Sequence, residues 1–138
     1  MFRRDYIQRM IEEFGKMIGH VMGLRAMNQE ELALEELRAG YKTYFGLDAQ
    51  IIHEYEPEKL IDILLSKEEL KNPHLDAIAR AIMTEGELLQ EISPLQANDL
   101  RKKALLLFLH LEKSDHETFS ITRKNAIEEL GSILENPS

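Results

Sequence analysis

Apolar side chains recur at helical spacing through almost the whole chain. Between residues 6 and 24 they follow the i, i+3, i+4, i+7 rule, with polar residues between them. The apolar positions of this segment are Ile7, Met10, Ile11, Phe14, Met17, Ile18, Val21, Met22 and Leu24. No segment alternates polar and apolar residues convincingly, as a half-exposed strand would. The pattern predicts an all-α protein that begins with a strongly amphipathic helix.

Capping residues and prolines divide the rest of the chain into further helices. Asn28 followed by Glu31 has the spacing of a capping box and predicts a second helix that runs to about Gly46. Proline is favoured in the first turn of a helix, so Glu-Pro, Asn-Pro and Ser-Pro pairs also predict helix starts. The later predicted starts are Asp48, Glu56-Pro57, Ser66 with Glu69, Asn72-Pro73 and Ser93-Pro94, with a last helix between about 117 and 136. In total the sequence predicts about six or seven helices.

Short loops between the predicted helices favour antiparallel neighbours, as in helical hairpins. No low-complexity linker interrupts the chain, so residues 1–138 are expected to form one domain. Within it, residues 1–26 form the amphipathic N-terminal helix and a candidate oligomerisation element. Residues 28–136 form the helical hairpins.

Two stretches have the length and pattern of helix, turn and helix: "LALEELRAGYKTYFGLDAQIIHEY" and "LRKKALLLFLHLEKSDHETFSITRKNAIEEL". They resemble the tetratricopeptide-like class of stacked helical hairpins, whose repeat is about 34 residues long. With "RDYIQRMIEEFGKMIGHVMG" at the front, the chain is also similar to small bacterial all-helical proteins. The resemblance implies a superhelix of stacked hairpins that acts by binding protein. It supplies no catalytic residues.

Charge is distributed unevenly along the sequence. The whole chain carries a net charge of −8, yet residues 1–25 hold five basic and three acidic residues, so the remainder carries −10. An acidic body disfavours binding to nucleic acid, because such binding depends on neutralising phosphates. Cysteine is absent, which excludes disulfides, thiol nucleophiles and thiolate metal sites. We therefore expect no nucleic-acid partner.

Neither a secretory signal nor a membrane span is indicated. Glu12 and Glu13 interrupt the place where the apolar core of a signal would lie, behind Arg3 and Arg4. The longest apolar run covers only residues 104–109, far short of the roughly 20 residues that cross a bilayer. The sequence therefore predicts a soluble, cytoplasmic protein without membrane insertion.

Candidate chemistry is sparse. His110 and His116 lie near Glu112, Asp115 and Glu117, and a carboxylate–histidine cluster can hold Zn²⁺ or a similar metal. This is the alternative function: a helical enzyme that binds a metal or a small ligand. The sequence contains no Glu-x-x-His motif of a di-metal bundle and no glycine-rich phosphate loop. The preferred prediction is no enzymatic activity, no catalytic residue, no metal and no cofactor.

His53 and Glu54 are adjacent on a helix and face different ways, so they make a poor site. Two other histidines are predicted to be surface residues: His20 on the polar flank of the first helix and His74 in the first turn of a later one. Gly15, Gly19 and Gly23 recur every four residues along the first helix. Because each costs roughly 1 kcal/mol against alanine inside a helix, their line predicts the close approach of a neighbouring backbone.

Three alternatives remain for the apolar face of the first helix: a membrane surface, a second copy of the chain, or the core of its own domain. Mixed charges on the polar face disfavour the membrane. Ile7, Phe14 and Val21 with Met10, Met17 and Leu24 would make a short coiled-coil seam, so a homodimer is expected if the stripe packs in trans. Tyr41 and Tyr44 could add an aromatic binding surface on the second helix. The residues predicted to contact a protein partner are Ile7, Met10, Ile11, Phe14, Met17, Ile18, Val21, Tyr41 and Tyr44.

Overall fold

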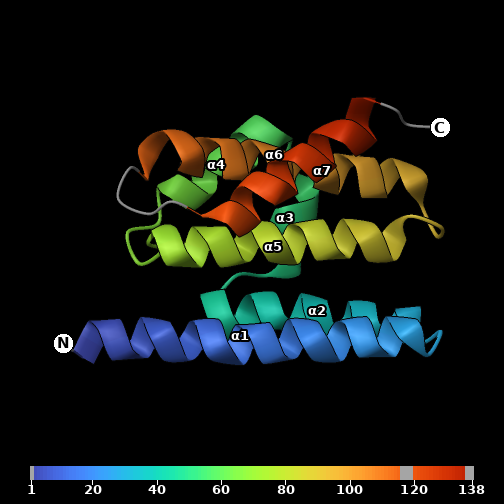
Figure 1. Ribbon diagram of the computed structural model, residues 1–138, viewed down its shortest axis with the longest axis horizontal. Helices are drawn as coiled ribbons and strands as arrows, with labels where there is room; N and C mark the ends of the chain where they lie inside the picture. Colours follow the sequence, from blue (N-terminus) through green and yellow to red (C-terminus); the bar gives the residue numbers. More distant parts are fainter. Residues whose placement is uncertain (1, 116–119, 136–138) are drawn as a thin grey trace.

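The described part of the chain folds into seven packed α-helices (Figure 1). The computed structural model describes residues 2–115 and 120–135, and these contain no strand. The all-α prediction is therefore confirmed. The helices are α1 (Phe2–Ala26), α2 (Glu30–Phe45), α3 (Ala49–Glu54), α4 (Pro57–Leu65), α5 (Asn72–Leu89), α6 (Pro94–Ser114) and α7 (Ile121–Glu135).

The helices lie in layers around α5. Figure 1 shows α1 and α2 as a hairpin on one side of α5, with α4, α6 and α7 on the other. Helix α5 contacts α1, α2 and α6, and its packing against α6 is the most extensive between any two helices of the described residues. The short α3 connects the two sides and contacts α2. Because α5 contacts both sides, its side chains lie at the centre of the structure.

Several predicted helix boundaries are confirmed. Pro57 and Pro94 are the first residues of α4 and α6, and Asn72-Pro73 begins α5. Gly46 ends α2 with a left-handed φ of 68°, and its N–H donates to a carbonyl of the last turn. Glycine adopts this conformation without the steric cost that other residues meet. Local sequence therefore determines these four boundaries.

Two predicted helix starts are wrong. Asn28 does not cap α2; it has a φ of 61° and lies in the turn after α1, where its N–H donates to the carbonyl of Arg25. Asparagine tolerates the left-handed conformation, which makes it suitable for either end of a helix. Ser66 ends α4 instead of starting a helix, because its hydroxyl donates to the carbonyl of Ile63 at 2.6 Å.

The line of Gly15, Gly19 and Gly23 does not mark a close approach. A Cβ atom added at any of the three would meet nothing within 4 Å, so that prediction is wrong. Close approach occurs instead at two glycines outside the line. A Cβ on Gly40 would lie 2.9 Å from the terminal methyl of Met17, and one on Gly86 would lie 3.2 Å from the carbonyl oxygen of Ala97. These glycines let α2 approach α1 and let α5 approach α6.

The apolar stripe of α1 packs against its own chain. Met10, Phe14, Val21 and Leu24 are buried in the core, and α1 contacts both α2 and α5. The ring of Phe14 lies 5.7 Å from that of Phe45, in the range of favourable aromatic pairs. The central residues of the stripe therefore pack within their own chain.

Candidate functional site

The residues predicted to contact a partner divide into three groups in the structure. Met10, Phe14, Val21 and Tyr41 are buried, so they offer little surface or none, although Met10 reaches the wall of a cleft. Ile7, Met17, Ile18 and Tyr44 are half-buried, and Ile11 is 46% exposed. The predicted binding surface at Tyr41 is wrong, because its side chain is fully enclosed and its hydroxyl makes a polar contact inside the protein. The members that can still meet a partner lie along the edges of the stripe.

Three of these residues border clefts at the N-terminal end of α1. Ile7 and Tyr44 line a cleft of about 740 Å³ between α1, the end of α2 and the segment that precedes α5. Met10 and Tyr44 line a smaller one of about 190 Å³. Both clefts share Tyr6, which is 68% exposed. We call the two together the α1 groove.

A second region, which was not among the predicted sites, combines burial with charge. Glu85 of α5 has a fully buried side chain. Its carboxylate accepts hydrogen bonds from the Tyr41 hydroxyl at 2.7 Å and from Nε of Arg38 at 3.0 Å. Nε2 of His53, on α3, also contacts this carboxylate. Donors from two other helices therefore converge on one buried carboxylate, as buried charge requires. We call this the Glu85 cluster.

The contacts of Glu85 determine its charge and that of Tyr41. Burial alone would raise the pKa of Glu85, but the hydrogen bonds and charge of His53, with the bonds from Tyr41 and Arg38, offset burial and lower it. The carboxylate is therefore ionised at neutral pH. The pKa of Tyr41 is raised well above its usual value, first by burial and then by the charge of Glu85. The phenol therefore remains a hydrogen-bond donor.

Helix α3 is held from a second direction by Lys103 of α6. The Lys103 side chain is fully buried, and its Nζ donates to the carbonyls of Ile52 and His53 at 2.7 and 3.3 Å. It also forms an ion pair with Asp99 at 2.7 Å. A cation at the carboxyl end of a helix satisfies carbonyls that have no partner within the helix. The backbone and the side chain of His53 are thus both fixed.

A cleft of about 650 Å³ opens above the Glu85 cluster. Arg38 and His53 line it and are about one-third exposed, at 37% and 35% of their side chains. The lining combines charged and amide groups with an apolar part, and it draws on α2, α3, α5 and α6. Its members are Arg38, Ala49, Gln50, His53, Glu54, Leu89, Leu95, Gln96, Asp99 and Leu100. The volume is in the range of small-molecule sites.

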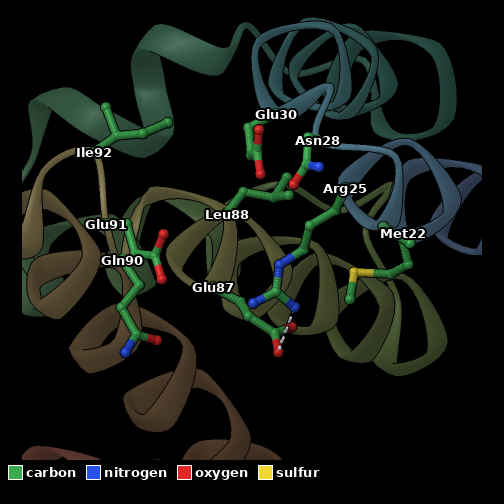
Figure 2. A pocket seen from close by; sticks show the side chains of 10 residues that line it. Met22, Arg25, Asn28, Glu30, Glu87, Leu88, Gln90, Glu91 and Ile92 are labelled. Atoms are coloured by element: carbon green, nitrogen blue, oxygen red, sulfur yellow. Dashed lines mark ion pairs between the residues drawn. The ribbon is translucent and has the colours of Figure 1, made fainter.

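A further cleft, of about 710 Å³, lies where the α1–α2 turn meets the α5–α6 turn (Figure 2). Figure 2 shows the guanidinium of Arg25 pointing toward Glu87, and the two form an ion pair at 3.1 Å. Both side chains are more than one-third exposed, so solvent weakens the pair. One charge of α1 and one of α5 thus compensate each other here. This cleft is a gap between the ends of packed helices, lined by residues of α1, α2, α5 and these two turns.

The predicted metal cluster is not assembled by its described members. Glu112 and Asp115 both pair with Arg123 of α7, at 2.8 and 3.5 Å. His116 and Glu117 lie outside the described residues. In residues 2–115 and 120–135 no three His, Asp or Glu side chains come together as metal ligands would. The alternative function therefore gains no support from the described part of the chain.

The prediction that His74 is a surface residue is wrong, because its side chain is buried. It does lie in the first turn of α5, where its Nδ1 accepts the N–H of Lys71 at 3.1 Å. Burial and the charge of Lys71 lower its pKa, so the ring remains neutral and can accept that hydrogen. His20 does lie on the surface of α1, where it pairs with Glu36 at 2.7 Å.

Comparisons with known proteins do not assign the chain to a family. No family model, no curated protein and no solved structure matches the chain. Within the part of the chain that the structure describes, none of the helices is both long and apolar enough to span a bilayer.

The sequence did contain a signal for the Glu85 cluster. Ile78 and Ile82 lie on the buried stripe of α5, and Glu85 occupies the next position of that stripe, before Leu89. Lys103 interrupts the stripe of α6 in the same way, between Leu100 and Leu107. An ionisable residue at a core position must find partners inside the protein. The identity of those partners is a matter of tertiary structure.

Proposed function

We propose that the protein is a non-catalytic binding module that acts by associating with protein, first of all with a second copy of itself through α1. The observation that carries the proposal is the α1 groove, where Ile7, Met10 and Tyr44 line two adjoining clefts beside the exposed Tyr6. An aromatic ring beside a cleft is a typical anchor of protein interfaces. Ile11, on another part of the surface of α1, adds apolar area to the same helix.

The arrangement of the helices supports the wider form of the proposal. Consecutive helices pack as neighbours in the pairs α1–α2, α5–α6 and α6–α7, as they do in stacked hairpins of the tetratricopeptide-like class. Proteins of that architecture present extended surfaces to other proteins. In this proposal the chain is a small cytoplasmic protein of bacterial type. A different protein partner would bind in the same α1 groove.

Self-association is tested by measuring the molar mass of the full chain by light scattering over a range of concentrations. We expect a dimer, and Tyr6→Asp and Ile11→Asp should each shift the mass toward the monomer. Both side chains are exposed, so neither change should disturb the circular dichroism spectrum. Leu109→Asp is the matched control, because Leu109 is 39% exposed and its helix, α6, lies on the other side of α5 from α1 (Figure 1). A wild-type chain that remains monomeric at all concentrations would end the self-association proposal.

A further inference from the structure

The cleft above the Glu85 cluster has unused hydrogen-bonding groups. Arg38 uses Nε for Glu85, and its two terminal nitrogens have no partner among the described residues. Each terminal nitrogen carries two N–H groups, and together they form a planar fork that matches a carboxylate. Contact with Glu85 limits the positions that the guanidinium can take. The fork is therefore positioned before any ligand arrives.

The same cleft has an apolar part that solvent reaches. Leu89 and Leu100 are buried, at 3% and 2% exposure, whereas Leu95 is 86% exposed. Leu95 lies in the first turn of α6, beside the cleft. An apolar molecule placed against these leucines would remove the exposed surface of Leu95 from water, which is favourable.

Charges around the cleft are largely compensated by the protein. Lys103 pairs with Asp99, and Glu85 is enclosed by its three donors, so neither carboxylate stands alone. Glu54 is the remaining acidic side chain of the lining. The positive charge of the lining is that of Arg38. The unused donors are its terminal nitrogens, and this favours an anionic head group with a flat pair of acceptors.

We infer that this cleft binds a small carboxylate with an apolar tail, its head on the terminal nitrogens of Arg38 and its tail on Leu89, Leu95 and Leu100. The walls are fixed in advance, because Glu85 holds the side chain of His53 and Lys103 holds the backbone of α3. A fixed site loses little entropy when a ligand binds. This inference is independent of the proposed self-association, since it uses a different surface.

The probe for this inference is octanoate, titrated into the full chain by calorimetry. Octylamine and octanol share its tail, and acetate shares its head group. We expect octanoate to bind at one site and the other three to bind at least about tenfold more weakly, because only octanoate presents both parts. Octylamine or octanol binding as tightly as octanoate would overturn the assignment of the head group. No octanoate binding in the millimolar range would overturn the inference as a whole.

Two variants locate the site. Leu95→Ser should weaken octanoate binding about fivefold to tenfold without unfolding the protein, since Leu95 is 86% exposed. Ile121→Ser is the matched control, because Ile121 of α7 is 62% exposed and does not line the cleft, and it should bind octanoate as the wild type does. Arg38→Lys keeps the charge but loses the planar fork and should weaken binding about tenfold. Unchanged affinity in Leu95→Ser, or an equal loss in Ile121→Ser, would place the ligand elsewhere.

Discussion

Two ionic clusters hold the helices together, and they are built in opposite ways. In the Glu85 cluster one carboxylate is surrounded by donors, and its side chain is fully buried. The second cluster centres on one guanidinium, that of Arg123 on α7, which pairs with Glu112, Asp115 and Asp76. The Arg123 side chain is 4% exposed, but its partners are 30%, 13% and 25% exposed. Water reaches both clusters through their outer members, since Arg38 and His53 are also about one-third exposed, but it does not reach the carboxylate of Glu85.

The burial of an individual member decides how much its cluster depends on it. A fully buried charge that loses its counterpart cannot recover the lost interaction from solvent. A partly exposed pair can, because water and the other partners replace what is removed. The central carboxylate of the first cluster should therefore be far more sensitive to substitution than a peripheral carboxylate of the second. The same isosteric change can be made in both.

The largest effect is expected from Glu85→Gln. The amide has the shape of the carboxylate but no charge, and its NH₂ group would face donors in place of an acceptor. We expect a loss of about 3–5 kcal/mol in the free energy of unfolding at neutral pH, because several hydrogen bonds to a charged acceptor, each contributing about 1.5–3 kcal/mol, are weakened or lost. Urea denaturation followed by circular dichroism measures it. A loss below about 1 kcal/mol would contradict the assignment of Glu85 as a buried charge at the centre of its cluster.

Acid unfolding of the same variant sharpens this test. The pKa of Glu85 is lower in the folded state than its ordinary value, so its charge stabilises the fold above that ordinary value. That contribution is lost as the pH falls through the lowered pKa. Glu85→Gln should therefore have a weaker dependence of stability on pH in acid than the wild type.

A smaller effect is expected from Tyr41→Phe. The change removes the hydroxyl that donates to Glu85 and leaves one carboxylate oxygen without that donor. Hydrogen bonds to charged groups contribute about 1.5–3 kcal/mol, so unfolding should become easier by that amount. Tyr44→Phe is the control, because the Tyr44 hydroxyl makes only a long contact of 3.4 Å with the carbonyl of Glu13. Equal losses in the two variants would show that the contact with Glu85 has no special weight.

The smallest effect is expected from Glu112→Gln. The amide oxygen can still accept from Nε of Arg123, and Asp76 and Asp115 remain as charged partners. We expect a loss of about 0.5–1 kcal/mol in the free energy of unfolding, typical of a partly exposed ion pair. The measurement is the same urea titration as for Glu85→Gln. A loss as large as that of Glu85→Gln would remove the difference between the two clusters.

Local signals in the sequence predicted much of the fold. The helical period located the helices, and Pro57, Pro94 and Gly46 located boundaries because each acts through its own backbone. Asn28 and Ser66 were assigned to the wrong role for a related reason. Short polar side chains can satisfy backbone groups at either end of a helix, and only the direction of the neighbouring chain distinguishes the two. His74 was placed correctly in a first turn, but its burial could not be inferred from position alone.

The sequence by itself determined that this chain is helical, where most of its helices lie and which face of each is apolar, because these properties follow from spacing within one turn. Only the tertiary structure decided that Tyr41, His53 and Glu85 meet. The three residues lie on three different helices, and Glu85 is 44 residues from Tyr41 and 32 residues from His53 along the chain. The tertiary structure also decided that the helices approach closely at Gly40 and Gly86 and not at the glycine line of α1. Contacts between distant segments depend on how whole helices pack, and no local pattern records that packing.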